Sequence, residues 1–371
     1  MKVAIRSRAD ASRPFGTFTR PFWLGEELAI LGNEVVHFCV SHPAEAELKA
    51  KYYRIGPELL SGAWTGMQPT VDNAFRLIEG KPDVLYVHQS TNLGFLAPRF
   101  FHLYPTVVDV HGSESLELKA FGHPKRAGRA RLLEAAVLRA ANCIIAASAE
   151  LRLFLVEEYN LDPKSVYVVP NGVPSGTVMR PPSPSEEWRR RLGVGVGEFL
   201  VLCAAPQPFG ANDLATDFLA EVSRLARVQS LPVRFVVTGR SSAPDGILST
   251  GVVQDYIGLI DSSDVTILPY PPSAICGGIR NKCLEFMARG RPVISTTEGI
   301  RGLGSANPDV HYIVAETPSE SVAALSSLFT DEEKRLSLGR SAKNLAGRFL
   351  WSKSAAQLID ALRDTVKNRN R

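Results

Sequence analysis

Short runs of β-branched and apolar residues alternate along this chain with longer stretches whose apolar residues recur at helical spacing. In the first half, this alternation predicts a series of strands and helices that builds a parallel sheet covered by helices. The expected strands are residues 2–6, 34–39, 84–88, 106–110, 143–147 and 166–169, and the expected helices are 22–31, 125–141 and 149–159.

The second half repeats the alternation after a proline-rich break. Residues 174–185 carry four prolines, so we expect neither a helix nor a central strand there and place the interdomain linker in this segment. Further strands are expected at 199–204, 233–238, 265–269, 292–296 and 312–314, and helices at 213–228, 282–288, 318–328, 331–349 and 353–366. Asn212 and Ser352 are the expected N-caps of the first and last of these helices.

The predicted fold class is therefore α/β, with two Rossmann-like, doubly wound parallel-sheet domains that face a central cleft. Residues 1–173 form the first domain and 186–352 the second, while 353–371 should pack back on the first. Ligands of such sheets bind beyond the carboxyl ends of the strands. Each motif discussed below follows a predicted strand.

Composition narrows the class of protein further. The 371 residues suit two ordinary domains, and a net charge of +4 is too small to predict a nucleic-acid partner. The five cysteines are odd in number and irregularly spaced, which favours free thiols in a reducing compartment over disulfides or a metal site. Neither a leader sequence nor a membrane span is recognisable, so we expect a cytoplasmic protein.

Residues 277–285 carry the strongest chemical signal. Gly277, Gly278 and Ile279 form a turn that opens a helix, and Arg280 and Lys282 stand at the helix start. A helix N-terminus disfavours cations unless an anion lies there, so this pattern predicts an anion site rather than a turn with solvated cations. Glu285, about one and a half turns on, can accept hydrogen bonds from sugar hydroxyls. Diphosphate and ribose together point to a nucleotide sugar.

Two strand-to-loop motifs in the first half add candidates for the same cleft. Asp109 and His111 end a buried strand, and His111 can donate a hydrogen bond to a substrate hydroxyl, the alternative being a locally satisfied capping histidine. Asn171 and Gly172 form a tight turn, from which Asn171 could contact the acceptor.

The loop at residues 12–20 gives a weaker signal for ligand binding. Gly16 permits close approach of a ligand to the backbone, and Arg13 and Arg20 could attract phosphate, but one glycine is no dinucleotide fingerprint. A basic run at 119–139 is interpreted as a solvated helix face, with contact to anionic lipid head groups or an acidic acceptor as the alternative. Such contact would place the protein at the inner face of the membrane.

Together the motifs resemble glycosyltransferase family 4, retaining enzymes of the GT-B fold. The matching segments are VVDVHGS at 107–113, VYVVPNGV at 166–173, SSDVTILPY at 262–270 and GGIRNKCLEFMARGRPVISTTEGIRGL at 277–303. The resemblance implies a nucleotide-sugar donor on the second domain, a saccharide, lipid-linked or small-metabolite acceptor on the first, and neither metal nor cofactor. It also implies that Glu285 binds the ribose, that Val252 and Val253 border the base, and that His111 lies near the transferred sugar.

The chain departs from the family pattern at two places. Gly277 replaces a glutamate common in the family, and residues 204–212 lack the usual arginine and lysine, so we expect Arg280 and Lys282 to supply that charge and stabilise the leaving diphosphate. The prediction is a retaining glycosyltransferase, in which the acceptor attacks from the face that the diphosphate leaves. A non-catalytic sugar-nucleotide-binding subunit and a nucleotide-sugar epimerase remain alternatives.

Overall fold

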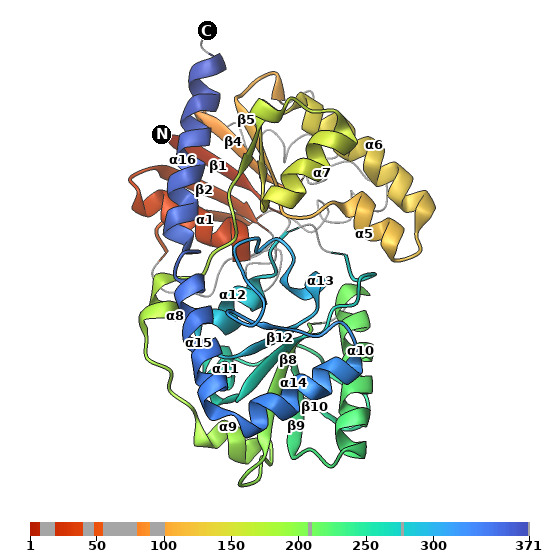
Figure 1. Cartoon of the computed structure of the whole chain (residues 1–371). Coiled ribbons are helices and arrows are strands. Elements are labelled where there is room, and N and C mark those ends of the chain that lie inside the picture. The colour runs from red at the N-terminus through yellow and green to blue at the C-terminus, as the bar shows by residue number, and fades with distance from the viewer. Residues whose placement is uncertain are drawn as a thin grey trace. The chain divides into compact units, whose positions relative to one another are not determined.

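The computed structural model in Figure 1 describes residues 1–7, 19–39, 48–54, 80–89, 101–206, 210–275 and 278–369. The chain divides into two compact units. The first combines Met1–Gly172 with Trp351–Arg371, and the second is Val173–Leu350.

The first unit contains a seven-stranded parallel sheet in the order β3-β2-β1-β4-β5-β6-β7. The chain winds outward from β1 through β2 to β3 and then returns to the other side of β1 with β4, so the strand order reverses between β1 and β4. The strands are β1 (Lys2–Arg6), β2 (Glu34–Cys39), β3 (Lys51–Arg54), β4 (Val84–His88), β5 (Thr106–Val110), β6 (Cys143–Ala146) and β7 (Val166–Val168).

Helices cover both faces of this sheet because successive strand residues point to opposite sides. Val3 and Ile5 belong to a core with α1 (Thr19–Ile30) and α16 (Trp351–Arg369), which lie side by side in Figure 1. Ala4 belongs to a second core with α6 (Pro124–Ala140) and α7 (Ala149–Tyr159). The remaining elements of this unit are α5 (Glu114–Ala120) and the 3-10 turn η4 (Pro163–Ser165).

The second unit contains a six-stranded parallel sheet in the order β10-β9-β8-β11-β12-β13, and its strand order reverses between β8 and β11. Its strands are β8 (Phe199–Ala204), β9 (Val233–Thr238), β10 (Ile247–Ser249), β11 (Val265–Leu268), β12 (Val293–Ser295) and β13 (Ile313–Val314). Its helices are α8 (Ser175–Met179), α9 (Glu186–Arg191), α10 (Gly210–Val228), α11 (Tyr256–Ser262), α12 (Asn281–Ala288), α13 (Thr297–Ile300), α14 (Pro318–Thr330) and α15 (Glu332–Ala346).

One core of the second unit forms where α10 and α14 pack on the sheet. Leu219 and Val222 of α10 meet Val322 of α14 over the buried strand residues Val237 and Val265. The two parallel α/β units confirm the predicted fold class, since the apolar strand residues form cores with the flanking helices in both halves.

The proline-rich segment differs from the prediction because it contains a helix, α8. Pro174 occupies the N-cap of α8 and the other prolines follow its end, so none of them interrupts a helical hydrogen bond. Buried Arg289 then holds this segment on the second unit. Its guanidinium pairs with Asp261 (N–O 2.6 Å) and donates to the carbonyl oxygens of Thr177, Arg180 and Pro181.

Two predicted N-caps are wrong. α10 begins at Gly210, so Asn212 lies inside the helix, where its side-chain amide donates to the carbonyl oxygen of Pro206. α16 begins at Trp351, one residue before Ser352, because Trp351 is fully buried in the core of the first unit and extends the helix into it.

Candidate active site

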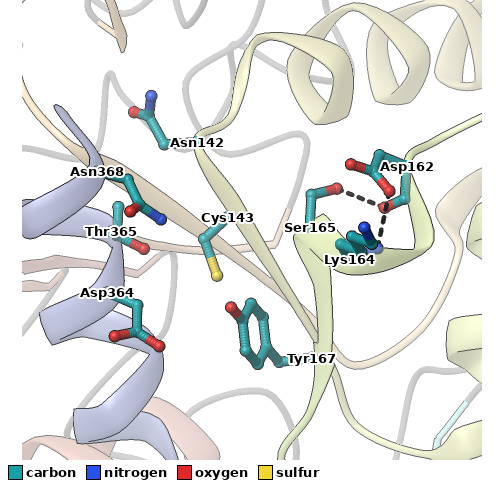
Figure 2. Close-up of a pocket in the computed structure, with 9 residues that line it drawn as sticks. All are labelled: Asn142, Cys143, Asp162, Lys164, Ser165, Tyr167, Asp364, Thr365 and Asn368. Carbon is teal, nitrogen blue, oxygen red and sulfur yellow. Dashed lines mark hydrogen bonds between the residues drawn. The ribbon is translucent and has the colours of Figure 1, made fainter. Parts of the chain in front are cut away.

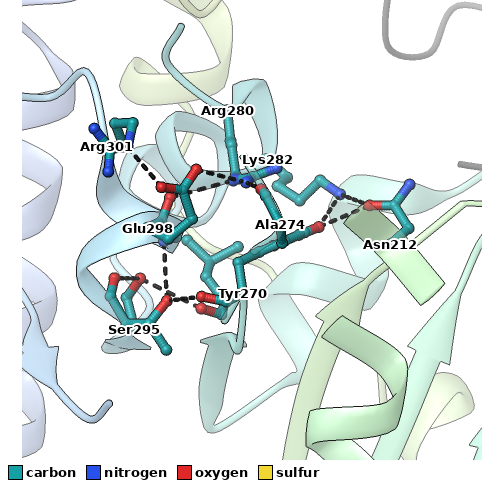
Figure 3. Close-up of polar contacts among 11 residues, drawn as sticks. Asn212, Tyr270, Ala274, Arg280, Lys282, Ser295, Glu298 and Arg301 are labelled. Carbon is teal, nitrogen blue, oxygen red and sulfur yellow. Dashed lines mark hydrogen bonds and ion pairs between the residues drawn. The ribbon is translucent and has the colours of Figure 1, made fainter. Parts of the chain in front are cut away.

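Lys282 lies at the carboxyl edge of the second sheet, where the strand order reverses. Its ammonium donates to the carbonyl oxygen of Ala204 (2.6 Å), at the end of β8, and to the hydroxyl of Tyr270 (2.6 Å), just after β11. It also donates to Oδ1 of Asn212 (3.1 Å), in the first turn of α10 (Figure 3). This edge, at the point of reversal, is where open parallel sheets bind ligands.

Arg280 precedes α12 and is buried beside Lys282. Its guanidinium carbon lies 3.7 Å from the centre of the Tyr270 ring. Nη2 donates to the carbonyl oxygen of Ala274 (2.6 Å) and approaches Oε1 of Glu298 (3.3 Å), and Glu298 also accepts a hydrogen bond from Arg301 (Figure 3). Two arginines therefore share one carboxylate, and Nη1 of Arg280 makes no hydrogen bond within the described part of the chain.

The turn before α12 packs tightly against a second turn. Ile279 is buried, and Gly302 adopts a φ of +84° next to it. A Cβ atom on Gly302 would lie 2.9 Å from the backbone nitrogen of Ile279, so glycine is required there for both conformation and space. Gly278 takes part in the same contact, whereas Gly277 lies outside the described residues.

Glu285 lies on α12 together with Lys282 and is half-buried. Burial raises its pKa to about 7, against the opposing effects of Lys282 and of a hydrogen bond from Tyr256. At neutral pH, a carboxyl with this pKa is close to half ionised.

The two valines expected to border the base lie in the segment between β10 and α11. Val252 is exposed and Val253 is half-buried.

In the first unit, a buried ion pair lies at the carboxyl ends of β4 and β5. Nη2 and Nε of Arg20 both donate to Asp109 (shortest N–O distance 2.7 Å), and Nδ1 of His88 lies 2.8 Å from the same carboxylate. Burial raises the pKa of Asp109, but Arg20 and the hydrogen bond from His88 outweigh it and hold the pKa well below its usual range. Arg20, expected from the sequence to attract phosphate, is thus neutralised internally.

His111 is connected to this ion pair through His88. Its ring stacks on His88, with centroids 5.1 Å apart and planes 8° from parallel. The side-chain amide nitrogen of Gln89 lies 2.6 Å from Nδ1 of His111, and Gln89 adopts the left-handed region with φ at 70° to reach it. Burial, together with the neighbouring His88, lowers the pKa of His111 to about 3, so the imidazole is neutral at pH 7.

The candidate residues thus form two groups, one in each unit. Arg280 precedes α12, and Lys282 and Glu285 lie on it. In the first unit, Nη1 of Arg20 donates to Oδ1 of Asn171 (2.9 Å), and His111 is linked to the Arg20–Asp109 pair through His88. Their contacts with donor and acceptor stay predictions. Arg13 and Gly16 lie outside the described residues.

The prediction missed five residues that build these groups: Tyr270, Asn212 and Glu298 in the second unit and His88 and Gln89 in the first. Tyr270, Glu298 and Gln89 follow the ends of β11, β12 and β4 by one to three residues. Polar residues just beyond the strand ends were therefore the available signal. Nothing in the sequence distinguishes the inward-facing Asn212 from an N-cap.

The basic run at 119–139 lies on α5 and α6. Its basic side chains are exposed, and Arg131 pairs with Glu158. Glu134, the acidic residue of the run, is instead buried, where it accepts from the backbone nitrogen of Glu114 (2.8 Å) and from the Tyr159 hydroxyl. Burial of Glu134 leaves the outer face of α6 predominantly positive.

The described residues also bear on metal sites, disulfides and membrane-spanning helices. They contain no cluster of side chains suited to hold a metal, and Cys39, Cys143, Cys203 and Cys283 are free and buried. No described helix is long and apolar enough to cross a bilayer. A cavity of about 290 Å³ lies at the amino ends of β6 and β7, at the edge of the first sheet opposite to Asp109 (Figure 2). It is lined by Asn142, Cys143, Asp162, Lys164, Ser165, Tyr167, Asp364, Thr365 and Asn368.

Solved structures show which class of fold this is. Sucrose-phosphate synthase from Thermosynechococcus elongatus superposes with a TM-score of 0.76 at 18% identity, covering 98% of both chains. Anabaena Alr3699/HepE, solved with UDP and glucose, gives 0.73 at 15% identity and covers 98% of this chain and 99% of its own. WaaG, a glycosyltransferase of lipopolysaccharide biosynthesis, gives 0.69 at 15% identity and covers 95% and 98%. The chain therefore has the GT-B fold of two Rossmann-like units.

Sequence comparison identifies the family. The model of Glycosyltransferase Family 4 matches residues 22–176, and that of Glycosyl transferases group 1 matches residues 201–331. The two matches together span most of the chain, which belongs to glycosyltransferase family 4.

Several relatives are named D-inositol 3-phosphate glycosyltransferase. The Kineococcus radiotolerans protein is 28% identical over 66% of this chain, and the alignment spans 62% of that relative, less than two thirds of its length. The Corynebacterium aurimucosum protein is 24% identical over 92% of this chain and 89% of its own.

Proposed function

We propose that this chain is a retaining, metal-independent glycosyltransferase that moves a sugar from a nucleoside-diphosphate sugar to a hydroxyl acceptor. The supporting observation is the position of Lys282, a cation at the strand reversal of the second sheet that also contacts the first turn of α10. Helix N-termini and cations at such a reversal suit a diphosphate. The likeness to HepE, solved with UDP-glucose, agrees with a nucleotide-sugar donor.

The donor side of the mechanism depends on charge. When the sugar leaves, negative charge grows on the diphosphate, and preorganised donors stabilise it best. Nη1 of Arg280 is available for this role, together with the amides that open α12. The ammonium of Lys282 donates to three uncharged oxygens, so it exchanges one of these partners for a phosphate oxygen or acts through its charge. Glu285 accepts from the ribose hydroxyls.

The acceptor side depends on a neutral histidine. Because the pKa of His111 is about 3, its imidazole donates one N–H to a sugar or acceptor hydroxyl without carrying charge. Asp109 is engaged by Arg20 and His88, so it does not serve as a carboxylate nucleophile on the sugar. We therefore propose that the acceptor hydroxyl attacks from the face that the diphosphate leaves.

The acceptor class includes saccharides, lipid-linked saccharides and small metabolites. The positive outer face of α6 favours a lipid-linked acceptor reached by peripheral contact with anionic lipid from the cytoplasm. Sedimentation with vesicles that contain phosphatidylglycerol tests this contact, with neutral phosphatidylcholine vesicles as the control. Equal binding to both would oppose it.

The function is tested first by a thermal-shift screen of the purified chain against UDP, GDP, ADP and their sugars, since a ligand of the folded state raises Tm. The best donor is then incubated with acceptors in the presence of EDTA, and NMR reads the anomeric configuration of the product. Retention of configuration with EDTA present is expected. An inverted product or a requirement for metal would contradict the proposal.

A non-catalytic sugar-nucleotide-binding subunit is the second candidate. Gly277 in place of the glutamate common in the family, and the lack of arginine and lysine in residues 204–212, favour it. Donor binding without product from any acceptor would support this candidate. A new sugar nucleotide formed from donor alone would indicate an epimerase instead.

A further inference from the structure

Arg240 is a buried cation at the same edge of the second sheet. It follows β9, the strand beside β8, by two residues. Its side chain is 9% exposed, with Nη2 donating to Oδ1 of Asp213 (2.8 Å) and Nη1 lying 3.5 Å from the carbonyl oxygen of Ala205. Nε is buried and has no hydrogen-bond partner in the part of the chain that the structure describes.

Arg240 and Lys282 flank the end of β8 from opposite sides. Lys282 contacts the carbonyl oxygen of Ala204, whereas Arg240 approaches that of Ala205. Their other partners, Asn212 and Asp213, are consecutive residues in the first turn of α10. Both cations also lower the pKa of the buried Cys203 thiol, although burial outweighs them and the pKa is raised to about 11. The two charges therefore converge on one place at the start of a 19-residue helix.

The backbone holds Arg240 in this position. Gly239 adopts a φ of +86°, and a Cβ atom there would lie 2.8 Å from Cα of Pro206. Only glycine therefore lets the turn after β9 pack directly on the segment that follows β8. The turn carries the guanidinium to the sheet edge rather than into solvent.

Arg240 has a weak counter-ion. Its partner Asp213 has a side chain that is 51% exposed, so the ion pair compensates the buried guanidinium poorly. A buried guanidinium with an unmet N–H is costly, and the N-terminus of α10 adds positive potential. An anion between Arg240 and Lys282 would satisfy Nε and the helix start together.

We propose that Arg240 binds the diphosphate of the donor through Nε and so supplies, from the turn after β9, the positive charge that residues 204–212 lack. This inference rests on the proposed function, since it assumes a nucleotide-sugar donor. It adds a third cation, from a different strand, to Arg280 and Lys282. The competing view is that Arg240 serves only as the ion-pair partner of Asp213.

Calorimetric titration of Arg240→Gln tests the proposal. The probes are whichever of UDP, GDP and ADP binds the wild-type chain best and the matching nucleoside, which lacks phosphate. Loss of a hydrogen bond to a charged group should raise the Kd of the diphosphate roughly 10- to 100-fold and leave that of the nucleoside unchanged. Arg224→Gln, which breaks an exposed ion pair with Glu221 on α10, is the control and should bind both as wild type does.

Two further variants separate the competing views. Asp213→Asn should improve diphosphate affinity if Arg240 binds phosphate, because it removes a competing carboxylate, and should leave the affinity unchanged if Arg240 only pairs with Asp213. Arg240→Lys should give an intermediate loss, and it decides the matter if Arg240→Gln does not fold.

The proposal is overturned if Arg240→Gln, or Arg240→Lys in its place, binds the diphosphate as wild type does, or if diphosphate and nucleoside weaken equally. A wild-type chain that binds no nucleoside diphosphate would remove the proposed function and this inference with it. If the wild-type chain binds the diphosphate and Arg240→Gln binds it equally well, this inference fails while the proposed function stands.

Discussion

The carboxyl edges of the two sheets both lie at a reversal of strand order, but their charge balance differs. In the first unit, Arg20 is matched by Asp109, which His88 also contacts, so the buried charge is neutralised within the edge. In the second unit, Lys282 donates to the uncharged oxygens of Ala204, Asn212 and Tyr270, and Arg280 shares Glu298 with Arg301. A neutralised edge suits a rigid support for a neutral histidine, whereas an unbalanced one suits an anionic ligand.

The largest effect should come from breaking the neutral edge. Asp109→Asn leaves Arg20 as a buried charge without its carboxylate, which we expect to lower the free energy of unfolding by about 3–5 kcal/mol. Urea denaturation measures this. Asp245→Asn, which breaks an exposed pair with Arg227, should leave the urea midpoint unchanged. Equal midpoints for wild type and Asp109→Asn would show that the pair does not support the edge.

Removal of a cation from the carboxyl edge of the second sheet should weaken nucleoside-diphosphate binding rather than lower the stability of the fold. Lys282→Met is expected to raise the Kd for a nucleoside diphosphate roughly 100-fold, as for the loss of a charge-assisted contact to phosphate. Calorimetry provides the readout, and Lys125→Met on the exposed face of α6 should bind as wild type does. Unchanged affinity in Lys282→Met would place the diphosphate elsewhere.

The half-ionised carboxyl of Glu285 predicts a pH dependence of donor binding. Ribose hydroxyls need the ionised carboxylate as acceptor, and with a pKa of about 7 its population falls as pH drops from 8 to 6. Donor affinity should therefore weaken about tenfold over this range if only the ionised form binds. Glu285→Gln should lose most of this dependence, which separates it from titration of the phosphate. An identical pH profile in both proteins would exclude the ribose role.

The smallest effect is expected at the tyrosine between the two cations. Tyr270→Phe keeps the ring beneath Arg280 but removes the hydroxyl that accepts from Lys282. The Kd of the diphosphate should change about fivefold, as for one hydrogen bond. Tyr53→Phe, on exposed β3, is the matched control. A change as large as that of Lys282→Met would mean that the hydroxyl itself contacts the donor.

Local pattern was sufficient for most of the secondary structure. The strands β8 and β9 and the helix α7 occupy the predicted ranges, because alternation and helical periodicity are properties of neighbouring residues. Errors arose where tertiary packing decides an end, as at Trp351, or where a side chain has two possible uses, as at Asn212. Motif order along the chain was likewise enough to recognise the family.

The sequence by itself determined two doubly wound α/β units and a cationic, glycine-led helix start at residues 277–282, since both depend on short-range order. Only the tertiary structure decided which charges are balanced. The pairing of Arg20 with Asp109 joins residues 89 apart, and Lys282 meets Ala204 across 78 residues. Strand order brings such groups together, and their distances and burial then decide whether a cation is neutralised or left for a ligand.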